Sequence, residues 1–257
     1  MSEDVTDLNP ARGLEGLAEA NPWPHSKPDA PTSSWGWGID GDELLRSSIA
    51  RDAAVIVEIG SLLGGSARFF AELCPSAHLI CIDPWFDVDD PADRPFLAHA
   101  PELADFVMSE TDGIHQIFLA SNWELRHRVT PLRGYSPDPL ITVHDHGVVP
   151  DVVYIDGSHV YEDVLADLFT TRLLFPDTVV CGDDWNWPAV QRAVEYLARN
   201  RGDVVRNLGN TWVIERGATA GRYPAASAVT VGPVERSVAG RAMQRLLDVR
   251  TGRSPAR

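Results

Sequence analysis

The sequence predicts an α/β fold, in which a Rossmann-like, doubly wound and mostly parallel seven-stranded sheet carries an N-terminal arm and an inserted helical lid. Short apolar runs rich in β-branched residues, such as residues 53–57, fit strands that are buried on both faces. These runs alternate with segments of helical periodicity, which is typical of a parallel sheet. The chain has 257 residues, of which 44% are hydrophobic, enough for one such domain with an extra segment at each end.

The expected elements follow one another in the order that a doubly wound sheet requires. The first unit contains a strand over 53–57, a glycine-rich turn over 60–65, a helix over 66–73 and a strand over 78–82. A helix over 44–49 precedes it, with Asp40 or Asp42 as a candidate cap. The remaining expected strands cover 128–132, 151–155, 178–181 and 211–215, and the remaining expected helices cover 102–109, 114–124, 161–174 and 188–200.

Three parts are expected along the chain. They are an irregular N-terminal arm or lid over 1–38, an α/β domain over 39–216 and a basic C-terminal tail over 217–257. Within the domain, residues 84–124 form a helical insertion. One further helix fits residues 234–249 of the tail.

Composition narrows the classes of partner. The formal net charge of -15 disfavours nonspecific binding to nucleic acid, because an acidic protein repels the phosphate backbone. No apolar run approaches the roughly 20 residues that cross a bilayer, and the acidic N-terminus lacks the pattern of a signal peptide. Three cysteines without CxxC spacing argue against a disulfide framework or a structural zinc site. We expect a cytoplasmic homo-oligomer, a dimer or higher, with neither a membrane nor a nucleic-acid partner.

Polar residues gather at the ends of the expected strands, where open parallel sheets bind their ligands. They are Glu58, Asp83, Ser136, Asp156, Asp183 and Asp184. Because the carboxyl ends of parallel strands meet at one edge, we expect these side chains to lie together. This co-location is the strongest functional signal in the residues themselves.

The first turn contains three glycines, at Gly60, Gly64 and Gly65, which allow a tight turn and a close approach to a ligand. Asp83 follows Glu58 by 25 residues, a position from which a carboxylate can accept hydrogen bonds from both hydroxyls of a ribose. The glycine spacing departs from the GxGxxG pattern of nicotinamide enzymes. The turn therefore predicts a nucleoside site, with a purely structural turn as the alternative.

At these residues the chain resembles a known family. Residues 58–66 and 81–85 are similar to motifs I and II of class I S-adenosylmethionine-dependent methyltransferases. The resemblance is to the group that contains methyltransferase domain 24, the macrocin-type O-methyltransferases and the cephalosporin-hydroxylase-like proteins. It extends over residues 49–215, and its more diagnostic blocks are 154–159 and 182–184.

The resemblance implies a role for each residue of the first two motifs. The turn from Gly60 to Gly65 would hold the methionine part of the cofactor, and Glu58 would support this loop and the amino group. Asp83 would bind the ribose and Trp85 would cover the adenine, although simple packing of Trp85 is an equal alternative. The remaining residues that the resemblance assigns to the cofactor are Ser61, Ser66, Ser136 and Asp156.

A second set of acids predicts a metal site. Asp156, Asp183 and Asp184 would repel one another at adjacent strand ends unless a cation lies between them. Their hard oxygen ligands suit Mg²⁺. In macrocin-type relatives these positions bind a metal that holds substrate oxygens. The alternative is that one or two of these acids cap the following helices.

The expected base is His159. Related metal-dependent enzymes of the catechol type often use a lysine, but Lys27 is the only lysine of this chain. Histidine titrates near neutral pH, which suits the deprotonation of a metal-bound hydroxyl beside Asp156. A structural role for His159 is the alternative. His144 and His146 are interpreted as residues of a solvated turn and not as a metal pair.

Together these features predict a methyltransferase (EC 2.1.1.-) that uses S-adenosylmethionine and Mg²⁺ to methylate a hydroxyl group of a small molecule. The acceptor would be a glycoside or another secondary metabolite, as in antibiotic biosynthesis. Two alternatives stay open. One is a hydroxylase-like or cyclase-like enzyme of the same fold, and the other is a non-catalytic subunit that binds the cofactor.

Overall fold

The computed structural model describes residues 10–33, 40–87, 95–98 and 100–217. Its centre is a seven-stranded sheet with the strand order β3-β2-β1-β4-β5-β7-β6. The first five strands of the chain run parallel, and β7 and β6 continue the sheet antiparallel. This confirms the predicted fold class. The strands are β1 Val55–Ile59, β2 His78–Asp83, β3 Val129–Arg133, β4 Val152–Ile155, β5 Val179–Gly182, β6 Val204–Leu208 and β7 Thr211–Glu215.

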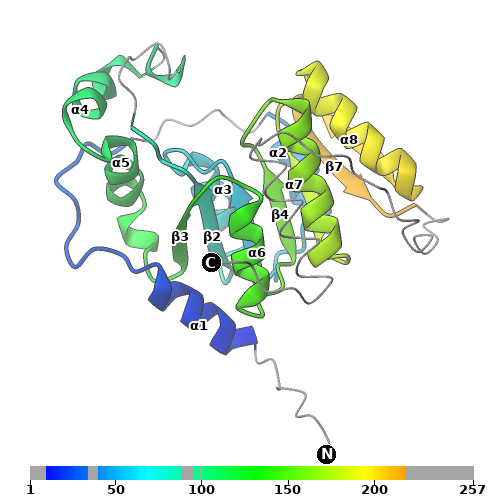
Figure 1. Cartoon of the computed structure of the whole chain (residues 1–257), viewed down its shortest axis with the longest axis horizontal. Coiled ribbons are helices and arrows are strands. Elements are labelled where there is room, and N and C mark those ends of the chain that lie inside the picture. The colour runs from blue at the N-terminus through cyan, green and yellow to red at the C-terminus, as the bar shows by residue number, and fades with distance from the viewer. Residues whose placement is uncertain (1–9, 34–39, 88–94, 99, 218–257) are drawn as a thin grey trace, which may run out of the picture.

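Helices cover both faces of the sheet (Figure 1). Two separate apolar clusters fill the space between the layers. One lies under α2, α3, α4 and α5, and the other lies under α1, α6, α7 and α8. The helices are α1 Pro10–Ala20, α2 Asp42–Ser48, α3 Gly65–Leu73, α4 Ala104–Ser109, α5 Gly113–Ser121, α6 Asp138–Asp145, α7 Tyr161–Leu174 and α8 Pro188–Arg201. The 3₁₀ segments among the described residues are η2 Pro95–Ala98, η3 Pro101–Leu103 and η4 Trp123–Leu125.

Strict alternation along the central strands explains the two clusters. In β1, Ile56 belongs to the first cluster and Val57 to the second. Val152 and Val153 of β4, which pair with these two residues, divide in the same way. Successive side chains of a strand point to opposite faces, so a strand between two helix layers must be apolar at nearly every position. This is why β1 reads as a continuous apolar run.

Four elements differ from the sequence prediction. The arm is not irregular throughout, because α1 lies within it and Leu17 is fully buried. Strand β6 and helix α6 were not predicted. The strand lies at the sheet edge with mostly exposed residues, so it lacks the apolar run of a buried strand. Helix α2 begins after Gly41, which caps it without a side-chain hydrogen bond, so neither expected aspartate is its cap.

The arm is attached to the edge of the sheet. The indole Nε1 of Trp23 donates a hydrogen bond of 2.6 Å to the carbonyl oxygen of Val129 in β3. The ring of Trp23 also stacks on Phe118 and meets Trp123 edge-on. Because β3 is an edge strand, this contact covers backbone groups that another chain could otherwise pair with. The predicted tail helix over 234–249 lies outside the described residues.

Of the helices in the described part of the chain, none has the length and apolar character that crossing a bilayer requires.

The docking of the arm can be tested at Trp23. Replacement by Ala should lower the free energy of unfolding by about 2–4 kcal/mol, because it removes both ring packing and an indole hydrogen bond. Trp23→Phe should lose only about 1 kcal/mol, since it keeps the ring. Denaturant unfolding gives both values, and limited proteolysis should cut the arm faster in Trp23→Ala. If Trp23→Ala and Trp23→Phe had the same free energy of unfolding, ring packing at residue 23 would not stabilise the arm.

Candidate functional site

Four of the acids expected at the strand ends lie at one edge and on one face of the sheet, namely Glu58, Asp83, Asp156 and Asp183. Glu58 pairs with Tyr154 of β4 in the strand register, and both belong to the same alternating set. Asp156 comes two residues after Tyr154, and Asp183 comes two residues after Cys181, which pairs with Tyr154 in β5. Both acids therefore belong to the same alternating set as Glu58. Side chains two apart point to the same face. Acids that are distant in sequence thus lie along one rim, whereas Asp184 has the opposite parity and Ser136 bonds to Asp167 of α7.

The glycine-rich turn packs directly on the end of β4. Gly60 has a φ of +90°, and a Cβ atom on it would lie 2.0 Å from the carbonyl oxygen of Asp156. Gly64 has a φ of +77°, and a Cβ atom there would meet the Asn122 side chain at 2.2 Å. Both positions need glycine, because φ is positive there and because neighbouring atoms leave no room for a Cβ atom. The turn thus brings the first strand end close to the acids that follow β4.

Glu58 supports the turn from below. Its Oε2 accepts a hydrogen bond of 2.6 Å from the Ser61 hydroxyl, and the side chain is almost completely buried. Burial raises the pKa of Glu58 above its ordinary value, and the hydrogen bond from Ser61 lowers it in part. The arrangement agrees with the role in loop support that the resemblance implied for Glu58. Ser66 lies in the first turn of α3, beyond Gly65.

Asp83 ends β2 and closes the turn from the other side. Its Oδ2 accepts a hydrogen bond of 3.0 Å from the amide of Leu62, and its Oδ1 accepts one of 2.7 Å from the amide of Trp85. Both carboxylate oxygens of Asp83 therefore take part in holding the turn. Asp83 therefore has a structural role in the turn, in addition to the ribose contact that the sequence predicts.

The expectation that Trp85 covers an adenine is wrong for this structure. The Trp85 side chain is fully buried, its Nε1 donates a hydrogen bond of 2.8 Å to the carbonyl of Leu62, and its ring stacks on His115. No face of the indole is open to a ligand. The sequence analysis missed the exposed aromatic residues nearby, Phe86 and Tyr135, whose ring centroids lie 6.1 Å apart. Both residues closely follow a predicted strand, β2 or β3, and this position could have identified them as candidates from the sequence.

Ser136 lies three residues after β3, and its hydroxyl donates a hydrogen bond of 3.0 Å to Oδ2 of Asp167 in α7. Asp167 is buried, and its other carboxyl oxygen has no hydrogen-bond partner among the described residues. Burial raises the pKa of Asp167 to about 8, a shift that the hydrogen bond from Ser136 partly offsets. This carboxyl links the loop after β3 to helix α7, and the sequence analysis did not identify it.

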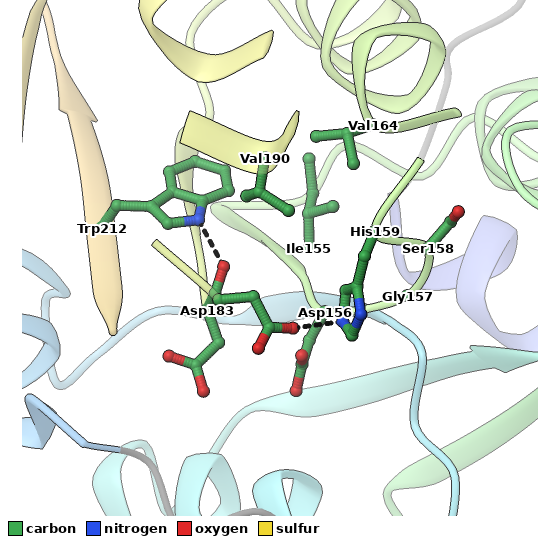
Figure 2. Close-up of a pocket in the computed structure, with 10 residues that line it drawn as sticks. Ile155, Asp156, Gly157, Ser158, His159, Val164, Asp183, Val190 and Trp212 are labelled. Atoms are coloured by element: carbon green, nitrogen blue, oxygen red, sulfur yellow. Dashed lines mark hydrogen bonds and ion pairs between the residues drawn. The ribbon is translucent and has the colours of Figure 1, made fainter. Parts of the chain in front are cut away.

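The second set of acids lines a small pocket with His159 (Figure 2). Asp156 comes from the end of β4, and Asp183 and Asp184 come from the end of β5. Burial raises the pKa of Asp156 well above its ordinary value, and the negative charges of Asp184 and Asp183 raise it further. Burial followed by the charge of Asp184 also raises the pKa of Asp183, to about 6. Mutual repulsion is therefore a property of this pocket, as the sequence predicts.

The pocket is not arranged as a ready metal site. In the described ranges, no three His, Cys, Asp or Glu side chains are grouped so that they could hold one metal ion. Instead, Nε2 of His159 lies 2.5 Å from Oδ2 of Asp184. Oδ1 of Asp183 accepts a hydrogen bond of 3.3 Å from the Thr211 hydroxyl. The three carboxylates are neighbours, but two of them have protein partners.

His159 lies at the mouth of the pocket with an exposed aromatic neighbour. The ring centroids of His159 and Trp187 are 4.4 Å apart, and 47% of Trp187 is exposed. The amide of Trp187 donates a hydrogen bond of 2.8 Å to the carbonyl of Asp184, which holds the indole beside the acids. Trp187 was not predicted from the sequence. The sequence feature that could have identified Trp187 is its position two residues after Trp185, close to the predicted acids.

His144 and His146 do not belong to the site. His144 lies in the last turn of α6, so the interpretation of a turn is wrong for its backbone, whereas His146 and Gly147 do form the turn that follows this helix. Nδ1 of His146 lies 2.9 Å from the carbonyl oxygen of Thr142, a local contact of the helix end. His144 is paired with Asp145 at the surface.

The charge state of Asp167 should set a pH dependence of stability. The carboxyl ionises near pH 4 in the unfolded chain but only near pH 8 in the folded one, so the folded state binds more protons between these values. Stability from this group is therefore lost as the pH rises from about 4 to 8. Asp167→Asn should raise the free energy of unfolding by about 1–3 kcal/mol at pH 7.5 and by much less at pH 4.5.

Denaturant unfolding at the two pH values measures this difference. Glu162→Gln is the matched control, because Glu162 is an exposed acid on the same helix. It should change stability by less than about 0.5 kcal/mol at either pH. The same gain for Asp167→Asn at both pH values would show that ionisation of Asp167 does not matter.

A family model described as a methyltransferase domain matches residues 57–185, which is half of the chain. No curated protein sequence matches the chain. Among solved structures, the chain is similar to the apo structure of CalS11, described as a TDP-rhamnose 3'-O-methyltransferase of calicheamicin biosynthesis. The identity is 18%, the match covers 67% of this chain and 76% of that chain, and the TM-score is 0.43.

Two further solved structures have similar values. An O-methyltransferase from Bacillus cereus in complex with SAH has 17% identity, with 82% of this chain and 92% of that chain covered and a TM-score of 0.43. The O-methyltransferase NovP has 17% identity, with 68% and 78% covered and a TM-score of 0.41. The family model covers β1 to the end of β5, including the turn and both sets of acids. The chain belongs to the methyltransferase domain 24 family, within the class I methyltransferases.

Proposed function

We propose that this methyltransferase transfers the methyl group of S-adenosylmethionine to a hydroxyl oxygen of a small molecule. The observation that carries the proposal is the position of His159, held by Asp184 on the rim that also contains Asp156 and the turn above Glu58. A base and a nucleoside site on one rim suit the deprotonation of a hydroxyl beside a bound methyl donor.

The residues around the turn fit the cofactor. The Gly60–Gly65 turn has two positive-φ glycines where the chain passes close to the end of β4. Asp83, 25 residues after Glu58, is the acid that would accept hydrogen bonds from the ribose hydroxyls. Oε1 of the buried Glu58 carboxyl has no hydrogen-bond partner among the described residues, so it could accept a hydrogen bond from the amino group of the cofactor. When bound, the sulfonium supplies a methyl group whose carbon–sulfur bond breaks as the bond to the acceptor oxygen forms. The protein contributes alignment of the acceptor and removal of its proton.

His159 would remove that proton through Nδ1. Its Nε2 lies 2.5 Å from Oδ2 of Asp184, so the carboxylate favours the tautomer in which Nε2 carries the hydrogen. Nδ1 is then the basic nitrogen. As the proton arrives, the ring becomes an imidazolium, and the adjacent carboxylate stabilises this charge. Trp187 limits the rotation of the ring from one side.

Magnesium assistance is also part of the proposal. The donor chemistry of Asp156, Asp183 and Asp184 fits Mg²⁺, because all three are hard oxygen ligands and their mutual repulsion favours a bound cation. These three residues would supply oxygen ligands to the ion, although the structure does not group them so that all three could hold it as they stand in the described ranges. The ion would lower the pKa of a coordinated hydroxyl. Protein contacts of Asp183 and Asp184 would have to be shared with the ion.

The acceptor that we propose is a small molecule with a hydroxylated ring, of the kind found in secondary metabolites such as antibiotics and their sugars. The exposed Trp187 ring beside His159 offers an apolar face to such a ring. Incubation with labelled S-adenosylmethionine and panels of catechols and glycosides tests the proposal. Methyl transfer to oxygen supports it, whereas a product without label favours a hydroxylase-like or cyclase-like enzyme.

Removal of the base should slow the chemical step. His159→Gln should reduce kcat by about 10²–10⁴-fold with little effect on cofactor binding, because the imidazole acts on the acceptor and not on the donor. The matched control is His144→Gln, an exposed histidine at the end of α6, which should keep full activity. Single-turnover rates and calorimetry with S-adenosylhomocysteine separate the two effects. An unchanged single-turnover rate for His159→Gln would assign the base elsewhere.

Removal of one carboxylate should weaken magnesium binding. Asp183→Asn keeps an oxygen that can accept the hydrogen bond from Thr211, so the fold should persist. The variant should bind Mg²⁺ at least about tenfold more weakly in calorimetry and lose activity, since it lacks one charged ligand. Circular dichroism checks the fold. Full turnover by the wild-type protein after chelation of divalent ions would defeat the magnesium proposal.

A further inference from the structure

Helix α7 carries an apolar stripe on its more exposed side. Leu165, Phe169 and Leu173 recur every four residues, which places them on one face of the helix. Leu173 is 53% exposed, and the other two are half-buried. Asp167 and Arg172 of the same helix are buried. A surface helix normally buries its apolar residues and exposes its charged ones, so this side of α7 is suited to contact with a further segment.

Helix α8 extends the stripe. The ring centroids of Tyr196 and Phe169 are 6.4 Å apart, and 46% of Tyr196 is exposed. Helix α7 lies between α6 and α8 (Figure 1), so the stripe is in the middle of this helix layer. Leu165, Phe169, Leu173 and Tyr196 together form what we call the α7–α8 patch. Exposed apolar groups that lie next to one another in this way mark interaction surfaces.

The chain leaves the described domain beside this patch. Strand β7 ends at Glu215, and Nη2 of Arg216 donates a hydrogen bond of 2.8 Å to the carbonyl oxygen of Pro176. Pro176 comes three residues after Leu173 and two residues after the end of α7. The C-terminal tail therefore begins next to one end of the helix that carries the stripe.

The charge of the tail is opposite to that of the rest of the chain. Residues 218–257, which lie outside the described ranges, contain seven arginines and only two acids, Glu235 and Asp248, a net charge of +5. Because the whole chain has a net charge of -15, the remaining residues carry -20. Opposite charge attracts the tail to its own domain, whereas the domains of two copies repel each other. Charge therefore favours the tail over a second copy as the segment that covers the patch.

The sequence of the tail also contains a matching apolar pattern. A helix is predicted over residues 234–249, and four of its apolar residues stand at i, i+4, i+8 and i+11. This is the spacing of a stripe along one face of a helix. The four residues are Val238, Ala242, Leu246 and Val249.

We propose that residues 234–249 pack as an amphipathic helix on the α7–α8 patch of the same chain. A helix over these residues is about 24 Å long, close to the roughly 21 Å of α7. Residues 218–233 span up to about 50 Å when extended, so the helix can reach every part of the patch. Packing removes both apolar stripes from water, which is the driving force for docking. The inference goes beyond the proposed function and does not depend on methyl transfer.

Limited proteolysis of the full chain tests the proposal. Trypsin cuts after Arg241 and Arg245, which lie inside the segment. A docked helix should be cut at least about tenfold more slowly than a synthetic peptide of residues 230–253, because cleavage requires local opening. Leu173→Asp brings a charge into the patch and should speed cleavage of the tail by about tenfold. Mass spectrometry of the fragments gives each rate.

Two further variants complete the design. Leu246→Asp interrupts the stripe of the tail and should speed cleavage as much as Leu173→Asp does. Met108→Asp is the matched control, because Met108 is an exposed apolar residue of α4, on the opposite side of the sheet. It should leave the cleavage of the tail unchanged. Circular dichroism checks each fold, and Leu246→Asp serves if Leu173→Asp does not fold.

Light scattering after gel filtration gives the mass of each variant and separates the possible occupants of the patch. A protected tail that Leu173→Asp and Leu246→Asp both release, with unchanged mass, supports the proposal. Cleavage of the wild-type tail at the rate of the peptide overturns it, and so does a protected tail that Leu173→Asp does not release. A lower mass of Leu173→Asp would mean that a second copy covers the patch, which also overturns the proposal.

Discussion

Four carboxylates from four neighbouring strands share one edge and one face of the sheet, and this concentration of negative charge constrains the rest of the site. They are Glu58 of β1, Asp83 of β2, Asp156 after β4 and Asp183 after β5. Charges this close are costly to bury unless hydrogen bonds or cations compensate for them. The protein compensates only in part, with the Ser61 hydroxyl and backbone amides at the turn. Positively charged ligands would compensate for the negative charge that remains.

The two ends of this rim differ in exposure, and the difference suits a transfer between two molecules. At the turn, Glu58 and Trp85 are buried and held by several hydrogen bonds, so a cofactor would meet a nearly rigid surface. At the other end, His159 and Trp187 are partly open to solvent. The donor side of the rim is therefore rigid, and the opposite end is open to a second molecule.

The arm connects the two layers of the molecule at the edge of the sheet. Leu17 of α1 is buried in one apolar cluster, and Trp23 packs on the other, next to β3. From there the chain reaches Ser33, which bonds to Arg68 beside the turn. The arm therefore links the stability of the edge strand to the geometry of the turn. A segment that is weakly patterned in sequence thus becomes a structural support of the site.

The sequence by itself determined the sheet and the rim. The apolar runs of β1 and β2 and the periodicity of α8 identify elements, because local pattern follows from burial on each face. Parallel strand ends then bring Glu58, Asp156 and Asp183 together. Only the tertiary structure decided which way Trp85 faces, that Asp184 pairs with His159, and that Asp167 and Arg68 have partners far away in the chain. These outcomes depend on packing between segments that are distant in sequence, and such packing produces no periodic pattern in the sequence.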